Sequence, residues 1–97
     1  MSYEADMRAF IIASQAQGIR ATADRPGSRP LSPPKHLAIL VDEAKKNAQP
    51  GSLGAQAIAR VEKAIEAAGD GDYVENDRVD LMLIVDLAAP LPQEQEA

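Results

Sequence analysis

Prolines and glycines divide this chain into short segments, and these breaks restrict its fold more than any other feature of the sequence. They gather at 26–34, 50–51, 69–71 and 90–92. Proline fixes φ and lacks an amide donor, so it starts or ends a helix and does not fit a central strand. The residues between the breaks must therefore form short elements joined by tight connections.

The stretches between the breaks carry the periodicity of helices. Apolar side chains recur every three or four residues over 2–23, 33–48, 52–69 and 77–89. Ser2 and Ser32 are expected to cap the first two helices, since a serine hydroxyl accepts from the free amides of a first turn, and the third helix is expected to start at Ser52. The sequence predicts an all-α fold, a small bundle of three or four helices with a proline-rich connector over 24–32.

The last stretch also fits a strand. Alternate positions are apolar at Val79, Leu81, Leu83, Val85 and Leu87. The alternative fold is therefore α+β, with a C-terminal strand at 79–87 that pairs with its copy across a dimer. We favour the helix because no other segment offers a convincing partner strand.

The composition leaves a modest core. The 97 residues correspond to a single domain, 1–97, and they include one Phe, two Tyr and no Trp. The core must combine small faces of Leu, Ile, Val and Met from several helices, and such chains often need a second copy for stability. The end of the chain, 90–97, is expected to be a flexible acidic tail.

The net charge of −5 gives no general attraction to phosphate backbones. We therefore expect a protein partner or a homodimer rather than nucleic acid. The N-terminus lacks the basic and apolar regions of a secretory signal, and the longest apolar runs, such as Leu81 to Val85, are far too short to cross a bilayer. The expectation is a cytoplasmic protein with no membrane contact.

Candidate chemistry is sparse. The chain has no cysteine, which excludes disulfides, thiolate nucleophiles and cysteine-based zinc sites. The single histidine, His36, falls in the first turn of a predicted helix with no partner for a metal or a nucleophile. We expect no catalytic residue, cofactor, metal or small-molecule substrate, and so no enzyme.

An acidic cluster invites comparison with a calcium loop. Its members are Asp70, Asp72, Glu75, Asp77 and Asp80. The comparison fails because Glu75 stands where the loop needs glycine and Leu81 where it needs a bidentate carboxylate. The cluster is instead expected to cap a helix or to contact a basic partner.

The first helix carries two apolar stripes. Tyr3, Met7, Phe10 and Ile11 share one face, whereas Ile12, Ala16 and Ile19 fall on another. Two stripes indicate contacts on two sides, so the second stripe is offered either to the chain's own helices or to a partner. The candidate partner-binding residues are Phe10, Ile11, Ile12 and Ile19, with Asp70, Asp72, Glu75 and Asp77.

These features predict a non-enzymatic protein-interaction module, a small regulator or inhibitor that occupies a partner surface. By analogy alone, small acidic proteins of this build include those that phages direct at host machinery. The alternative is a DNA-binding regulator of helix-turn-helix type, whose corner is 49–52 and whose groove-facing residues are Gln56, Arg60 and Lys63. The net charge argues against this alternative.

Overall fold

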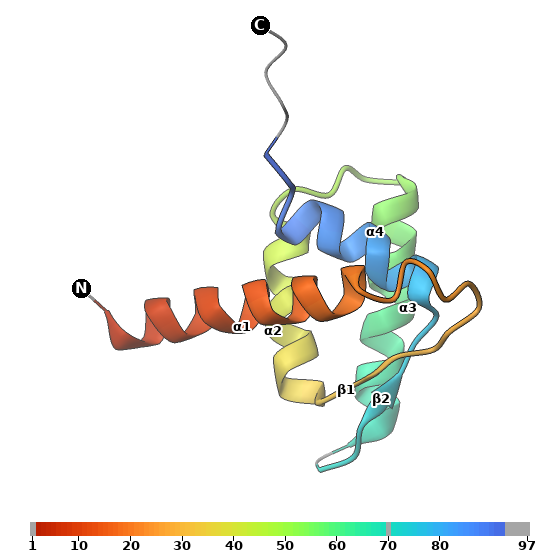
Figure 1. Cartoon of the computed structure of the whole chain (residues 1–97), viewed down its shortest axis with the longest axis horizontal. Coiled ribbons are helices and arrows are strands. Elements are labelled where there is room, and N and C mark those ends of the chain that lie inside the picture. Colours follow the sequence, from red (N-terminus) through yellow and green to blue (C-terminus); the bar gives the residue numbers. More distant parts are fainter. Residues whose placement is uncertain (1, 70, 93–97) are drawn as a thin grey trace, which may run out of the picture.

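The breaks in the sequence separate four helices. The computed structural model describes residues 2–69 and 71–92. Its helices are α1 (Tyr3–Arg20), α2 (Pro34–Lys45), α3 (Leu53–Ala68) and α4 (Arg78–Ala88), and its strands are β1 (Leu31–Ser32) and β2 (Val74–Glu75). The four helices pack together (Figure 1), which confirms the predicted all-α bundle.

The core lies where α2, α3 and α4 meet. Its largest fully buried side chains are Leu37, Leu40, Val41, Val61, Leu81, Ile84 and Val85. In α2 and α4 these residues fall at steps of one, three and four positions, and in α3 Val61 follows the buried Ala57 and Ile58 by four and three, so each helix buries one stripe against the others. Leu, Ile and Val supply this core, and no aromatic side chain is buried among the described residues.

The alternative of a C-terminal strand at 79–87 is wrong, because this segment forms α4. The Asp77 carboxylate accepts from the backbone N–H of Val79 at 2.7 Å and so starts the helix. Leu81, Ile84 and Val85 then reach the core together. This spacing is available only to a helix, whereas a strand would have sent Ile84 and Val85 to opposite faces.

The cap predicted at Ser2 is confirmed, and Ser52, where the third helix was expected to start, also caps its helix. The Ser2 hydroxyl accepts from the N–H of Ala5 at 3.2 Å, and the Ser52 hydroxyl accepts from that of Ala55 at 3.1 Å. The prediction for Ser32 is wrong, since Ser32 is buried in β1 and the extended Pro33 stands at the cap of α2. The ladder with β2 takes Ser32 away from the helix start.

The first two helices end before the predicted positions. The helix predicted over 2–23 stops at Arg20, where the Thr22 hydroxyl donates to the carbonyl oxygen of Ile19 at 2.6 Å. This bond satisfies an end carbonyl that has no partner within the helix. The helix predicted to reach residue 48 ends at Lys45, so the connection to α3 is longer than the predicted corner at 49–52.

The connector predicted over 24–32 contains β1 and runs beside the start of α4. In the antiparallel ladder, Leu31 pairs with Glu75 and Ser32 with Val74. The N–H of Arg78 also donates to the carbonyl oxygen of Ser28 at 3.2 Å. This contact between distant segments is not visible in local sequence patterns. Of the predicted tail, 93–97 lies outside the described residues.

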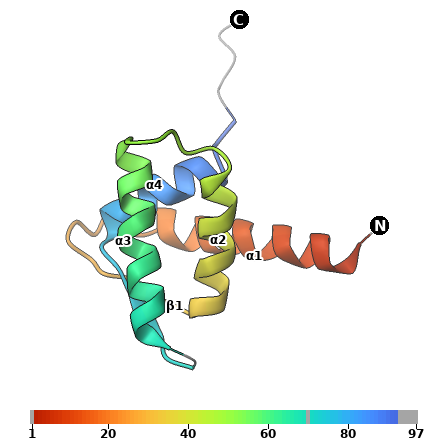
Figure 2. The same cartoon turned by 180° about the vertical axis from the view of Figure 1, so that it is seen from behind.

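The helix α1 lies only partly on the rest of the bundle. Its C-terminal half crosses the other helices, and its N-terminal half extends beyond them in both views (Figures 1 and 2). Ala16 and Ile19 are its buried residues. From Tyr3 to Phe10, only Arg8 is partly buried.

Candidate protein interaction surface

The N-terminal half of α1 presents three large apolar side chains to solvent. Tyr3 is 76% exposed, Met7 39% and Phe10 66%. Steps of four and three residues place them on one face of the helix. We call Tyr3, Met7 and Phe10 the outward stripe. Contiguous exposed apolar side chains on a projecting element are typical of interaction sites.

The second predicted stripe faces inward. Ile12 packs against the core, and Ala16 and Ile19 belong to it. Ile19 is only 5% exposed, so it is not accessible to a partner of the folded domain. Of the predicted apolar contacts, Phe10 is thus exposed, and Ile11 and Ile12 are half-buried.

Tyr3 and Met7 belong to the exposed surface, although the predicted contact set left them out. The helical spacing already joined them to Phe10. Sequence alone did not show which of the two stripes the core would cover, because both contain large apolar side chains.

Polar contacts hold α1 on α2. An Arg8 guanidinium nitrogen lies 3.2 Å from Glu43 Oε1, and Lys46 Nζ lies at the same distance from that oxygen. The hydrogen bond from Lys46, assisted by Arg8, lowers the pKa of the Glu43 carboxyl. Further along, Gln15 Nε2 donates to the carbonyl oxygen of His36 at 2.5 Å. These contacts fix the direction in which α1 projects.

A shallow hollow of about 390 Å³ lies beneath the projecting half of α1. Ala5, Ala9 and Ile12 line it from α1, and Ala88 and Ala89 line it from the end of α4. The projecting half therefore has small apolar side chains below it as well as the outward stripe above. Two helical turns with so little packing gain little stability from their own chain.

Glu75 and Asp77 of the acidic cluster are engaged in contacts within the chain. Arg29 Nε donates to Glu75 Oε2 at 2.6 Å, and Arg29 Nη1 lies 3.8 Å from Asp77 Oδ2. Asp77 also caps α4. Asp72 is exposed, and Asp70 lies outside the described residues. Glu75 and Asp77 thus tie the connector to α4, which reduces the negative charge that they offer a partner.

The residues of the DNA-binding alternative lie on α3. Arg60 donates to both carboxylate oxygens of Asp80, at 2.9 and 2.8 Å, and this pair raises the pKa of the Arg60 guanidinium. Gln56 Nε2 donates to the carbonyl oxygen of Gly51 at 3.3 Å, and Lys63 is exposed. A bidentate carboxylate competes directly with a phosphate or a guanine edge for Arg60.

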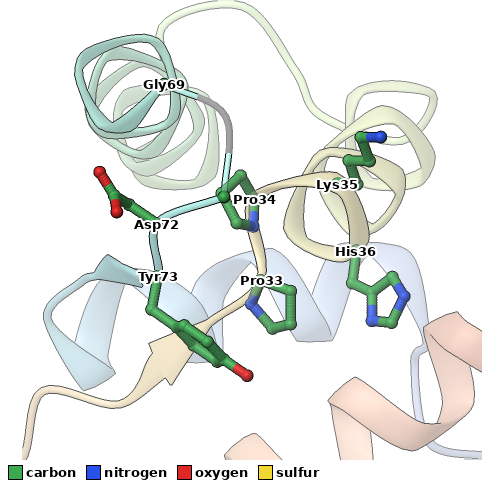
Figure 3. A pocket seen from close by; sticks show the side chains of 8 residues that line it. Pro33, Pro34, Lys35, His36, Gly69, Asp72 and Tyr73 are labelled. Carbon is green, nitrogen blue, oxygen red and sulfur yellow. The ribbon is translucent and has the colours of Figure 1, made fainter.

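A second hollow, of about 460 Å³, lies beside the start of α2 (Figure 3). Pro33, Pro34 and Tyr73 line it together with Lys35 and Asp72. The charged ends of Lys35 and Asp72 lie on opposite sides of Pro34 in this view. The polar groups of this hollow do not converge on one point, as a site for chemistry on a small ligand would require.

Within residues 2–69 and 71–92, no three acidic or histidine side chains are grouped closely enough to hold a metal ion. No helix in this described part combines the length and apolar character needed to cross a bilayer. Comparison with models of protein families, with curated proteins and with solved structures gives no match. The candidate site therefore depends on the geometry of the chain itself.

Proposed function

We propose that this chain is a non-enzymatic interaction domain whose binding surface is the outward stripe of α1. The observation that carries the proposal is the projecting N-terminal half of α1, which holds Tyr3, Met7 and Phe10 in solvent on one face. An amphipathic helix with anchors at such spacing binds by laying its apolar face in a groove of another protein.

The side chains of the outward stripe indicate what kind of partner surface would bind them. Tyr and Phe bury large areas with few rotatable bonds, so they serve as anchors in interfaces. Glu4 and Asp6 flank the stripe in the first turns of α1. The complementary surface therefore leaves room for the two aromatic rings and carries Lys or Arg beside Glu4 and Asp6. By occupying such a surface, the domain would act as a regulator or inhibitor of the protein that contains it.

The geometry favours this proposal over the DNA-binding alternative. Arg60, the central cation of the predicted recognition helix, is held by Asp80. Arg60 and Asp80 line a hollow together with Glu75 and Asp77. A phosphate backbone approaching Arg60 would meet these carboxylates as well.

The test compares two aspartate substitutions at similarly exposed apolar residues. Phe10→Asp places a charge in the outward stripe, and Leu53→Asp places one on α3, where Leu53 is 68% exposed. Both variants should remain folded by circular dichroism, since each changes a surface residue. Proteins from the native host that bind the immobilised wild-type chain are then purified, and their affinities for the three chains are measured.

The proposal predicts a purified partner that binds wild type and Leu53→Asp equally, and Phe10→Asp at least about tenfold more weakly. This ratio corresponds to about 1.4 kcal/mol, a small part of what an aromatic anchor contributes. Equal affinity for all three chains would refute the outward stripe as the binding surface.

A further inference from the structure

We infer that the outward stripe is covered by α1 of a second copy of this chain, which lies antiparallel to the first. The inference depends on the proposed function, because it assigns a partner to the same surface. It follows from the residues that continue the stripe along α1.

The outward face extends over the whole helix. Steps of four and three residues lead along Tyr3, Met7, Phe10, Ser14, Gln17 and Ala21, and all six are exposed. This alternation is the heptad spacing of paired helices. Ile12 and Ile19 lie on the opposite side of α1, against the core of their own domain. A second helix can therefore lie along the outward face while each domain body stays on its own side.

The two halves of this face are complementary in size. Its N-terminal half is bulky, whereas Ser14 and Ala21 carry small side chains and Gln17 a flexible polar one. Antiparallel pairing about the level of Ile12 sets Phe10 opposite Ser14, Met7 opposite Gln17 and Tyr3 opposite Ala21. The large Phe10 and Tyr3 then meet the small Ser14 and Ala21, as close packing requires, and Met7 lies against the flexible Gln17. Parallel pairing would instead place each bulky residue against its own copy and Gln17 against Gln17.

The flanking charges favour the same direction. In the antiparallel pair, Asp6 stands beside Arg20 of the second copy at both ends, and Ile11 meets Ile11 near the centre. Flanking charges of this kind set the orientation of paired helices. Arg20 uses one guanidinium nitrogen for Asp86 and the carbonyl of Ala89, and its side chain is 21% exposed. The guanidinium has five N–H donors in all, and Asp6 would bind to those on its other nitrogens.

The size of the paired surface suits a weak dimer. The 18 residues of α1 form a helix about 27 Å long. Tyr3 and Phe10 of the two copies together offer roughly 500 Å² of exposed aromatic surface. With Met7, Ile11 and the small residues opposite them, the interface reaches the roughly 1,000 Å² that specific association needs.

The first experiment measures mass by sedimentation equilibrium from about 1 μM to about 1 mM, the range in which interfaces of this size assemble. The wild type and Leu53→Asp should shift with concentration from the 10.3 kDa chain to twice that mass. Phe10→Asp should remain monomeric over the whole range. A monomeric wild type, or a dimer that Phe10→Asp leaves intact, would overturn the inference.

The second experiment determines the direction of pairing. The chain has no cysteine, so single-cysteine variants can be joined by a short bis-maleimide reagent without competing sites. In the antiparallel dimer Ala13→Cys should crosslink efficiently, because the two copies of residue 13 lie beside the two-fold axis. Gln17→Cys should not, since the two copies of residue 17 stand about 15 Å apart along the helices. Efficient crosslinking of Gln17→Cys would show parallel pairing and refute the proposed arrangement.

These results separate the inference from the function on which it rests. A monomeric chain whose purified host partner still rejects Phe10→Asp would refute the self-pairing and leave the proposed function standing. A monomeric chain whose host partner binds Phe10→Asp as well as wild type would refute both.

Discussion

Replacing Ile19 and Phe10 by alanine, one at a time, tests which face of α1 stabilises the fold. Ile19 is 5% exposed and belongs to the core, whereas Phe10 is 66% exposed. Truncating a buried isoleucine removes its transfer free energy and leaves a cavity, which together cost about 2–5 kcal/mol. That is a large share of the roughly 5–15 kcal/mol that stabilises a typical domain.

Phe10→Ala should cost far less. About two thirds of this side chain is already in water. Alanine also has the higher helix propensity, which offsets part of the loss by about 0.5 kcal/mol. We therefore expect a net change in the free energy of unfolding below about 1 kcal/mol.

The assay is urea unfolding followed by far-ultraviolet circular dichroism, at a protein concentration low enough to keep the chain monomeric. A fall in midpoint at unchanged slope reports lost stability. Ile19→Ala should lower the midpoint strongly and Phe10→Ala only slightly. If the two variants lose equal stability, or if Phe10→Ala loses more, the assignment of the two faces is refuted.

Three further substitutions test local features of the structure. Gly18→Ala should raise the free energy of unfolding by about 0.5–1 kcal/mol in urea, because Gly18 is helical and an added Cβ would meet nothing within 4 Å; a loss of stability would contradict this placement. Ser52→Ala should lower it by about 1 kcal/mol through loss of the α3 cap, and an unchanged midpoint would show that the cap is not formed in solution. The third substitution is Glu43→Gln. In the wild type, Lys46 and Arg8 lower the pKa of the Glu43 carboxyl. Ionised Glu43 stabilises the fold fully above its ordinary pKa of 4.5, and this contribution is lost as the pH falls through the lowered pKa. The thermal midpoint of Glu43→Gln should therefore fall less than that of wild type on acidification through this range, and equal falls would refute the role of Glu43.

The helices could be predicted from sequence because their signals are local. The start of α3 was correctly predicted, because Pro50, Gly51 and Ser52 act on the backbone directly beside them. The alternation over 79–87 was ambiguous because a segment that is apolar nearly all round satisfies both periodicities. The cap from Asp77 and the joint burial of Leu81, Ile84 and Val85 settle it as a helix.

The features that the sequence did not reveal depend on tertiary contacts. The local sequence indicates a helix cap at Ser32. Its pairing with Val74, far along the chain, places it in a strand instead. The local sequence indicates an exposed acidic patch, whereas in the fold Arg29 lies beside Glu75 and pairs with it. The direction of α1 is set by Arg8 and its partner on α2, and no local pattern shows that this places Phe10 in solvent.

Hydrogen exchange along α1 tests most directly whether its N-terminal half is a binding surface. Exchange is measured by mass spectrometry in dilute protein, in concentrated protein and in the complex with a purified partner. The amides of residues 3–10 should exchange rapidly in the dilute sample and slow markedly in at least one of the other two, with the slowing absent in Phe10→Asp. The C-terminal half of α1 should be protected in every sample, because it packs on the core. Exchange over residues 3–10 that is equally rapid in all three samples would contradict the account.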